Sequence, residues 1–367
     1  MSPIRVLIVD DSATVRSVIS QVLSTDPEIE VMGTAVNPVF AFRKMEQNWP
    51  DVIISDVNMP EMDGLTFLKK VMTTRPTPVI MCSTEVGDGA RAAVEALSWG
   101  AVELVQKPEV GLKGFLNDHA RDFVRAVKAA STVDVTKLGK KKRPAANSLS
   151  ATPEKNSADA ILPPLELGRL RNTDQNPIIA IGSSTGGTTA IEEVLSILPK
   201  TTPGIVIVQH MQEKFTAAFA QRLNTLTELD VKEGATGDVI EPGKVFVAPG
   251  GKHMMVKRIG GQHQIVVKDG PPVNRHRPSV DVLYRSVAKE VGKNAIGVIL
   301  TGMGDDGAAG MLEMRQTGAL TFAQDAASCV VYGMPKEAVR RGAVVRQLPL
   351  TEIPGAICRE LTKRALK

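Results

Sequence analysis

The chain has few of the residues that mark several large classes of protein. Aromatic residues make up 4% of its 367 residues, and 44 Lys and Arg against 40 Asp and Glu leave a formal net charge of only +4. A general nucleic-acid binder needs a basic surface or aromatic side chains on which bases stack, so the composition predicts no nucleic-acid partner. The length fits two domains, each large enough to bury its own core.

Cysteines and long apolar runs are also scarce. The three cysteines, Cys82, Cys329 and Cys358, have spacings that fit neither a disulfide framework nor a zinc site. No segment approaches the roughly 18 consecutive apolar residues of a membrane-spanning helix. We therefore expect a soluble protein of the reducing cytoplasm, without membrane insertion.

The first third of the chain alternates apolar runs with segments of helical periodicity. The runs are RVLIVD, EVMGTAV, DVIISD, PVIMCS and AVELVQ. This alternation predicts a doubly wound α/β domain with a five-stranded parallel sheet, which we place at residues 1–126. Residues 127–175 are rich in Lys, Pro, Ala, Ser and Asn without sustained periodicity, which predicts a flexible linker.

The alternation resumes over residues 176–367. Its apolar runs are PIIAIG, GIVIVQH, KVFVAP, QIVVKD, AIGVILTG and ALTFAQD, which predict a second doubly wound α/β domain with a mainly parallel sheet. In KVFVAPGGKHMMVKRIGGQHQIVVKD, short β runs are separated by Gly-Gly pairs. This stretch predicts an antiparallel hairpin within the second domain.

Polar side chains end several strands of the first predicted sheet. Asp10 and Asp11 follow the first strand, Asp56 ends the third, Ser83 the fourth and Lys107 the fifth. The carboxyl ends of parallel strands meet at one edge of a sheet. Clustered carboxylates suit Mg²⁺, and an Asp beside Mg²⁺ and a Lys suits a phosphoryl acceptor. Each acid taken singly is more typical of a helix N-cap, and the metal site is favoured by their occurrence together with Lys107 at matched strand ends.

The motifs IVDDS, DVNMPEMDG and QKP resemble the receiver domains of bacterial response regulators over all five strand-and-helix units. The resemblance implies that Asp56 accepts a phosphoryl group from a histidine kinase. It also implies that Asp11, Asp56 and the carbonyl of Asn58 bind Mg²⁺, and that Asp10 completes the pocket.

Two further receiver residues gain a role from the same resemblance. Ser83 is implied to contact the phosphoryl group, and Lys107 is implied to hold it. Many receivers have an aromatic residue at the position of Leu104, where it rotates on activation. That aromatic switch is therefore in doubt for this chain.

A glycine-rich turn opens the second domain. The stretch Ile181-Gly-Ser-Ser-Thr-Gly-Gly187 lies between a predicted strand and a predicted helix. It lacks the Gly-Lys-Ser/Thr ending of a phosphate-binding loop. It matches Gly-x-Ser-x-Gly, the pattern that places a serine, here Ser184, on a strand-to-helix turn. Glycine and serine also form ordinary turns and caps, so this pattern alone leaves the role of Ser184 open.

A nucleophilic serine needs a base and an acid to orient that base. His210 ends the run GIVIVQ and is expected at the same sheet edge as Ser184, whereas His119 is expected on the last receiver helix. Asp305 and Asp306 follow AIGVIL and reach that edge as well. A core or capping histidine remains the alternative for His210.

Two other functions compete with an esterase. Gly302, Gly304 and Gly307 match a dinucleotide fingerprint, with Asp325 beyond, which would suit a nucleotide-dependent oxidoreductase. Two carboxylates inside that loop would repel a pyrophosphate. A transcriptional response regulator would need a helix-turn-helix, which the strand-rich second half does not predict.

The motifs GSSTGG, VIVQHM, HRPSVDVLYRS and LTGMGDDGAAGM resemble the chemotaxis protein-glutamate methylesterases. The resemblance, with the receiver, covers nearly the whole chain. It implies that Ser184 is the nucleophile, His210 the base and Asp306 the orienting acid. Asp305 departs from the Asn that family members often have there. The implied substrates are methylated glutamates on cytoplasmic chemoreceptor helices, with deamidation of receptor glutamines. A chemotaxis histidine kinase is the implied phosphodonor, and the catalytic domain is expected to need no cofactor.

Residues beside the expected triad complete the prediction. The backbone N–H of Thr185, directly after the nucleophile, is a candidate oxyanion donor, and Met303 is a candidate for the second. His276 and the flanking Arg275 and Arg277 either line a groove for an acidic receptor segment or form a solvated turn before a helix.

Overall fold

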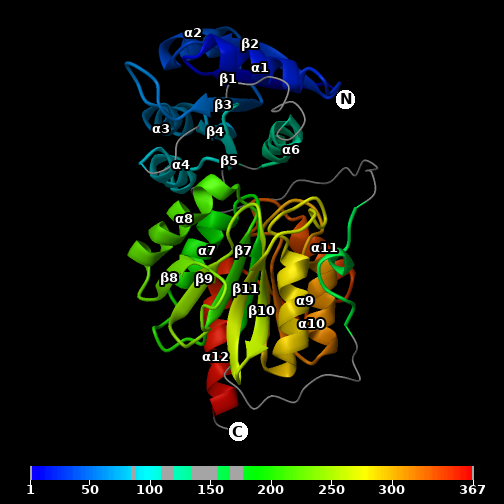
Figure 1. Cartoon of the computed structure of the whole chain (residues 1–367). Helices are drawn as coiled ribbons and strands as arrows, with labels where there is room; N and C mark the ends of the chain where they lie inside the picture. The colour runs from blue at the N-terminus through cyan, green and yellow to red at the C-terminus, as the bar shows by residue number, and fades with distance from the viewer. Residues whose placement is uncertain are drawn as a thin grey trace. The chain divides into compact units, whose positions relative to one another are not determined.

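The computed structural model describes residues 2–83, 88–108, 120–133, 135, 155–165 and 177–365. It divides into two compact units, Met1–Lys141 and Lys142–Lys367, which Figure 1 colours along the chain. His119 lies outside the described residues, and the domain boundaries placed at 126 and 176 remain a prediction. In the described part of the chain, no helix is long and apolar enough to cross a membrane.

The first unit is a five-stranded sheet with helices on both faces. Its strands lie in the order β2-β1-β3-β4-β5, and every neighbouring pair is parallel, which confirms the predicted receiver-type sheet. The strands are β1 (Ile4–Val9), β2 (Ile29–Ala35), β3 (Val52–Asp56), β4 (Val79–Ser83) and β5 (Glu103–Gln106). The described helices are α1 (Ala13–Leu23), α2 (Pro38–Gln47), α3 (Gly64–Thr74), α4 (Asp88–Ser98) and α6 (Ala120–Ser131).

Local sequence explains where these helices begin. Ser12, Asn37 and Asp63 are the N-caps of α1, α2 and α3, and each side chain accepts a hydrogen bond from the backbone N–H three residues on. The capping role in these helices therefore does not belong to the strand-end acids Asp10, Asp11 and Asp56.

The second unit contains a seven-stranded sheet in the order β14-β13-β12-β6-β7-β9-β8, with every neighbouring pair parallel. The strands are β6 (Ile179–Ser183), β7 (Ile205–Gln209), β8 (Asp230–Glu233), β9 (Lys244–Val247), β12 (Ile296–Ile299), β13 (Leu320–Gln324) and β14 (Arg346–Leu348). Sequence patterning missed the edge strands β8 and β14, because each buries one residue and so has no apolar run.

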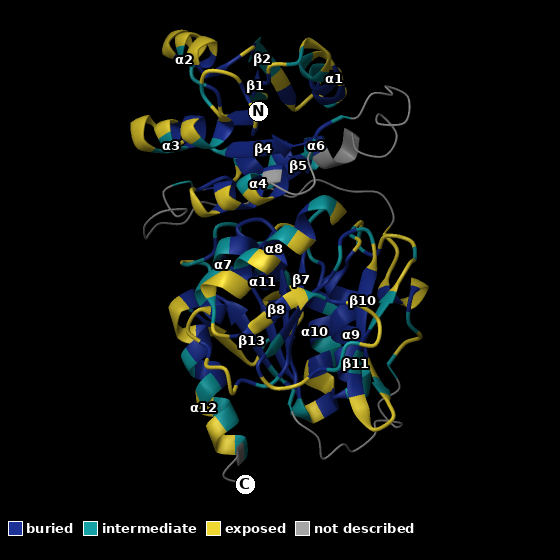
Figure 2. Ribbon diagram, turned by 60° about the vertical axis from the view of Figure 1, so that its left-hand side comes forward, coloured by how far each residue is buried: buried dark blue, intermediate teal, exposed yellow. Residues whose placement is uncertain are grey.

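Helices cover both faces of this sheet, so the predicted doubly wound architecture is confirmed. The helices α9 (Val280–Glu290), α10 (Ala308–Gln316) and α11 (Met334–Arg340) pack in one layer, and α7 (Gly187–Leu195), α8 (Glu213–Leu226) and α12 (Ile353–Ala365) in the other. The core strands are buried along their length, as Figure 2 shows in dark blue. Burial on both faces explains their continuous Val and Ile runs.

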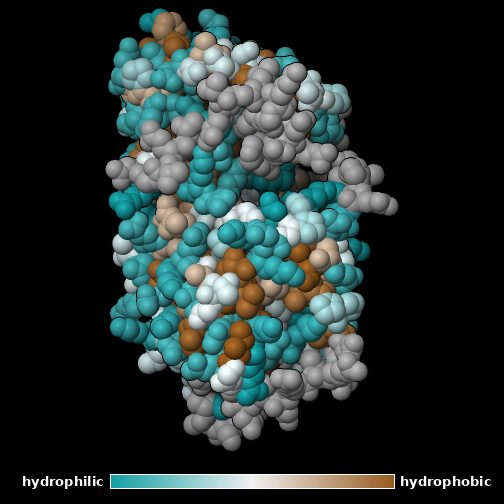
Figure 3. All heavy atoms as spheres, viewed as in Figure 1, coloured by the Kyte–Doolittle hydropathy of each residue, from teal (hydrophilic) through white to brown (hydrophobic). Residues whose placement is uncertain are grey.

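The predicted hairpin is a separate two-stranded antiparallel sheet, β10 (His253–Ile259) with β11 (Gln262–Lys268). Gly260 and Gly261 join the strands with φ of 58° and 86°, values that glycine adopts without steric cost. Placing the strand KVFVAP in this hairpin was wrong: it is β9, which pairs parallel with β7. Figure 3 shows hydrophobic side chains grouped on the face of the second unit where this hairpin lies.

A short described segment of the predicted linker packs within the second unit. Residues 155–165 include a 3₁₀ turn, and Ile161 lies in a small apolar cluster with Val273 and Val282. Arg285 of α9 bonds Asp159 at 2.5 Å. This segment therefore belongs to the packed structure of the second unit.

Candidate active site

The glycine turn lies between β6 and α7, at the carboxyl edge of the parallel sheet. Gly186 has φ 75°, and a Cβ built there would lie 2.6 Å from Cβ of Val330. Only glycine avoids both the strain and the clash at this position. The turn leaves Ser184 5% exposed, so the side chain lies in a nearly dry environment.

A second glycine-rich loop, Thr301–Gly307 between β12 and α10, packs directly on this turn. The N–H of Ser184 donates to the carbonyl of Thr301 at 3.0 Å. A Cβ on Gly302 would approach Cβ of Ser184 to 2.8 Å and Sδ of Met334 to 2.4 Å. The glycine at 302 is therefore explained by the close approach of two backbones rather than by a dinucleotide.

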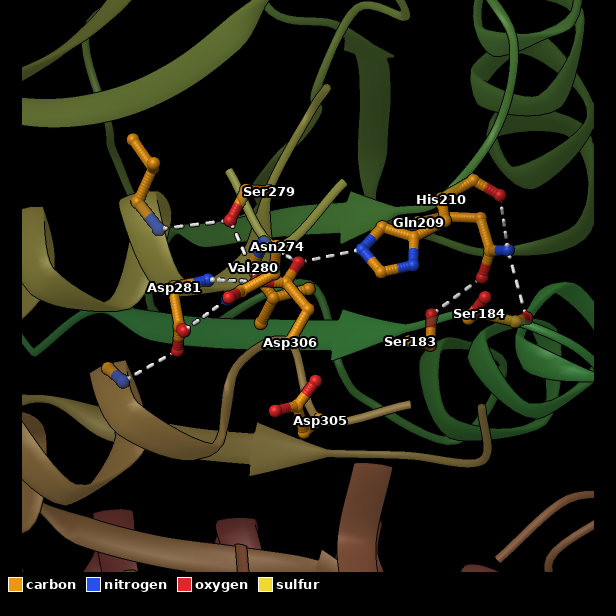
Figure 4. A network of polar contacts seen from close by, with 12 residues as sticks. Ser183, Ser184, Gln209, His210, Asn274, Ser279, Val280, Asp281, Asp305 and Asp306 are labelled. Atoms are coloured by element: carbon orange, nitrogen blue, oxygen red, sulfur yellow. Dashed lines mark hydrogen bonds and ion pairs between the residues drawn. The ribbon is translucent and has the colours of Figure 1, made fainter. Parts of the chain in front are cut away.

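His210 and Asp306 form a buried pair beside the turn. Nε2 of His210 lies 2.8 Å from Oδ2 of Asp306, and their side chains are 3% and 0% exposed. In Figure 4 the imidazole lies between Asp306 and Ser184. Nδ1 of His210 is buried and has no hydrogen-bond partner among the described residues.

Five donors surround the carboxylate of Asp306. They are His210 Nε2 at 2.8 Å, Val280 N at 2.7 Å, Ser279 Oγ at 2.8 Å, Asn274 Nδ2 at 2.9 Å and Asp281 N at 3.2 Å. Burial raises the pKa of Asp306, but the hydrogen bonds from His210 and Asn274 act in the opposite direction, and the pKa lies below its ordinary value.

The protonation of the imidazole follows from this anion. Because ionised Asp306 can only accept, Nε2 of neutral His210 carries the proton and Nδ1 keeps its lone pair. Nδ1 is thus the basic nitrogen, and a proton taken by it would give an imidazolium stabilised by Asp306. A serine nucleophile requires an imidazole that an ionised acid holds at one nitrogen and that can accept a proton at the other. Here Nε2 is the held nitrogen and Nδ1 the accepting one, the reverse of the usual triad, and no hydrogen bond joins Nδ1 to Ser184 among the described residues.

Gln209 ties the two catalytic candidates together. Its Nε2 donates to the carbonyl of Ser184 at 3.0 Å and to that of His210 at 3.1 Å, while its Oε1 accepts from the hydroxyl of Ser183 at 2.6 Å. Gln209 is 4% exposed. One buried amide therefore fixes the strand ends that carry Ser184 and His210.

The ring of His276 stacks on that of His210, with centroids 3.7 Å apart and planes 4° from parallel. Arg277, which was predicted to line a substrate groove with His276, donates to the carbonyl of Gly270 at 2.8 Å. The structure thus brings His276 to the catalytic pair and uses Arg277 to hold the loop.

The candidate oxyanion donors lie on the two glycine loops. Thr185 is 4% exposed and Met303 is 39% exposed. Among the described residues, no backbone acceptor takes the N–H of either residue. Both N–H groups therefore stay candidates for the oxyanion role.

Asp305 and Asp325 have other partners. Asp305 forms an ion pair with Lys155 and lies 3.7 Å from Arg341. Asp325 accepts from Ser328 N at 2.8 Å, within a local turn. Neither acid reaches His210, which agrees with Asp306 rather than Asp305 as the orienting acid.

In the first unit, the predicted carboxylate pocket forms at the carboxyl edge of the sheet. Nζ of Lys107 lies 2.9 Å from Oδ2 of Asp10 and 2.6 Å from Oδ2 of Asp56. Burial raises the pKa of Asp56 to about 6, although Lys107 and the N–H of Asn58 act in the opposite direction.

The other predicted pocket residues differ in exposure. Asp11 is exposed, whereas Ser83 and Leu104 are buried at 2% and 8%. Oxygens of Asp10, Asp11 and Asp56 lie within 4.8 Å of one another. This all-oxygen donor set fits a hard divalent cation such as Mg²⁺.

A second group of potential metal ligands, His210, His276 and Asp306, also lies within 4.8 Å. The carboxylate of Asp306 already accepts from five donors, and Nε2 of His210 is one of them. These contacts favour an orienting hydrogen bond over metal ligation at this position.

Comparison with known proteins identifies both units. The family model described as CheB methylesterase matches residues 179–357, and the response regulator receiver domain model matches residues 6–113. A protein-glutamate methylesterase/protein-glutamine glutaminase of Photobacterium profundum is 58% identical over 351 residues, 96% of this chain and 99% of the relative. The chain belongs to the CheB methylesterase family.

A second curated relative is similar over nearly the same length, and one solved structure is similar over half of the chain. A relative of the same name from Pseudomonas savastanoi pv. phaseolicola is 56% identical, covering 96% of this chain and 98% of the relative. The crystal structure of the Thermotoga maritima CheB methylesterase catalytic domain is 38% identical and covers 50% of this chain and 97% of that domain, with a TM-score of 0.49.

In this CheB family member, sequence reasoning missed the residues that support the triad candidates. Gln209 precedes His210 at a strand end, and that position was its only signal. Asn274 and Asp281, seven positions apart on a loop and on the helix that follows it, contact Asp306 from 32 and 25 positions away in the chain. No periodicity or spacing in the sequence points to them.

Proposed function

We propose that the chain hydrolyses glutamate methyl esters on the cytoplasmic helices of chemoreceptors, with Ser184, His210 and Asp306 as its catalytic residues. The observation that carries the proposal is the buried His210–Asp306 pair beside the Ser184 turn. Membership of the CheB methylesterase family supports the substrate class.

In the proposed reaction, Nδ1 of His210 takes the hydroxyl proton while Oγ of Ser184 attacks the side-chain ester carbonyl. Collapse of the tetrahedral intermediate breaks the bond to the methoxy oxygen, and His210 returns its proton so that methanol leaves. Water, deprotonated by His210, then hydrolyses the acyl-enzyme and regenerates the serine. Asp306 remains ionised and stabilises the imidazolium throughout.

The developing negative charge on the carbonyl oxygen needs fixed donors. The N–H groups of Thr185 and Met303 are proposed for this role, because each lies on a loop beside Ser184 and has no described backbone acceptor. Preorganised donors of this kind stabilise the transition state more than the ground state.

The same acyl-enzyme forms from a glutamine side chain if ammonia is the leaving group in place of methanol. Hydrolysis then yields glutamate in both cases. The names of the curated relatives include both activities, which supports proposing receptor deamidation for this chain.

The receiver unit is proposed to control the esterase. Asp56 would accept a phosphoryl group from a chemotaxis histidine kinase, with Lys107 and Ser83 contacting it. Asp11, Asp56 and the carbonyl of Asn58 would hold Mg²⁺, which supplies charge neutralisation at the transferred group. Since the proposed substrate and kinase act in the cytoplasm, we place the protein there.

Methanol release from methylated receptors tests the catalytic assignment. Ser184→Ala is expected to lower the rate by at least about 10³-fold, because no other nucleophile replaces the hydroxyl. Ser196→Ala, at the exposed C-terminal end of α7, is the matched control and should retain the rate. Substantial methanol release by Ser184→Ala would refute the assignment, and the assay repeated with a small phosphodonor tests control by the receiver.

A further inference from the structure

The loop between β11 and α9 is held in an unusual conformation close to the active site. Asn274 and Arg275 have φ of 48° and 70°, in the left-handed region. Asn is among the few residues with a side chain that enter this region readily. The N–H of Asn274 donates to the carbonyl of Asn156 at 2.9 Å, and the loop is closed by backbone bonds between Val273 and His276.

The side chain of Asn274 bridges two buried carboxylates. Its Nδ2 lies 2.6 Å from Oδ2 of Asp281 and 2.9 Å from Oδ1 of Asp306. An amide nitrogen carries two hydrogens, so one can point to each acid. Of the uncharged side chains, only an amide places two such hydrogens on one nitrogen.

Asp281 needs this donor because it is buried beside another acid. Its other oxygen, Oδ1, accepts from the N–H of Gly310 at 2.6 Å. Burial, followed by the charge of Asp306, raises the pKa of Asp281 to about 7. Without a hydrogen between them, the two carboxylates would repel each other, and Oδ1 of Asp306 would keep only the donors Ser279 Oγ and Asp281 N.

The bridge sets the rotation of Asp306. Asn274 and Ser279 donate to Oδ1, while Val280 N and His210 Nε2 are on Oδ2. Donors fixed on Oδ1 direct Oδ2 toward His210. Of the two side chains that donate to Oδ1 of Asp306, only Asn274 also donates to Asp281.

We propose that Asn274 is a positioning residue for ester hydrolysis, whose amide holds Asp306 in the rotation that orients His210. The inference rests on the proposed catalytic role of Asp306. Asn274 does not contact the substrate in this proposal and acts through Asp306.

Two variants test the role without adding backbone strain. Asn274→Gly removes the amide at a position whose φ glycine adopts freely. Asn274→Asp keeps the size but presents an oxygen to two carboxylates. We expect kcat for methanol release to fall about 10- to 100-fold in Asn274→Gly and further in Asn274→Asp, with KM within about twofold of the parent.

Proton NMR of the imidazole N–H between His210 and Asp306 separates positioning from loss of structure. In Asn274→Gly this N–H signal should move or broaden. The control for stability is Asn224→Ala, which loses the hydrogen bond from Val231 N to the Asn224 side chain. The unfolding midpoint of Asn274→Gly should stay near that of this control. Unchanged kcat, or reduced kcat with an unchanged N–H signal, would overturn the proposal. If Asn274→Gly fails to fold, the folded Asn274→Asp decides by the same two readouts.

Asp306→Asn distinguishes this inference from the proposed function. If Asp306→Asn stays active, the triad assignment itself fails. If Asp306→Asn is inactive and both Asn274 variants keep the parent kcat, the triad stands and only the positioning role of Asn274 is wrong.

Discussion

Asp56 and Asp306 are both almost fully buried at the carboxyl edge of a parallel sheet, yet their ionisation is shifted in opposite directions. Burial raises the pKa of Asp56 to about 6. The pKa of Asp306 lies below its ordinary value, although burial opposes that shift. Burial alone therefore does not decide the pKa of either carboxyl.

The donors around each carboxylate account for the difference. Asp56 receives Lys107 Nζ and the N–H of Asn58, and it shares the ammonium with Asp10. Asp306 receives five donors, none of them an ammonium group, and only the amide nitrogen of Asn274 is shared with a second acid, Asp281. A carboxylate that accepts several fixed hydrogen bonds stays ionised even when dry. The first environment suits a group that is modified, and the second a group that must remain an anion.

The largest expected effect comes from replacing the stable anion. Asp306→Asn keeps the shape but removes the charge that holds the proton on Nε2 of His210. We expect kcat to fall about 10⁴-fold, as when the orienting acid of a triad is replaced. Steady-state methanol release measures it, with the adjacent Asp305→Asn as a matched control expected within a few fold of the parent. A similar loss in both variants would contradict a special role for Asp306.

Removing one of the five donors should give an intermediate effect. Ser279→Ala deletes the hydroxyl that donates to Oδ1 and also caps α9. We expect kcat to fall about 10-fold and stability by about 1 kcal/mol. Ser12→Ala, which loses only a cap in the receiver, should show the stability loss without the kcat loss. Equal kcat in the two variants would show that the donor count around Asp306 is unimportant.

The smallest effect is expected at Asp56. A carboxyl whose folded pKa is raised costs stability above that pKa, and the cost disappears as pH falls toward the unfolded value. A pKa of about 6 corresponds to at most about 3 kcal/mol, and loss of the Lys107 pair offsets part of it. Asp56→Asn should therefore be about 1 kcal/mol more stable than the parent at pH 8 in chelator, with the difference smaller at pH 5. Denaturant unfolding at both pH values measures it, and a variant less stable at pH 8 would contradict this prediction.

Much of this arrangement could be predicted from the sequence. Buried apolar runs that end in Asp56, Lys107 and His210 place these side chains at strand ends, because a parallel sheet collects its carboxyl ends on one edge. The glycine pattern placed Ser184 at a turn, because glycine adopts the positive φ that Gly186 needs there. The hairpin was also predictable from Gly260 and Gly261.

The other contacts of the site join residues that are far apart in the sequence and meet only in the folded chain. The bond from Asn274 to Asp306 joins residues 32 positions apart in the chain. It requires a loop that neither periodicity nor turn chemistry specifies. The edge strands β8 and β14 each bury one residue, which gives no apolar run to recognise. The assignment of Nε2 to Asp306 and Nδ1 to the Ser184 side depends on the imidazole orientation, which sequence cannot contain.

A carboxyl-carbon NMR titration of the full chain in chelator tests the contrast between the two aspartates most directly. Asp56→Asn and Asp306→Asn identify the two signals. We predict that the Asp56 carboxyl titrates near pH 6, whereas the Asp306 carboxyl stays ionised down to the pH at which the protein unfolds. An Asp306 signal that titrates at or above the ordinary aspartate range would contradict the account.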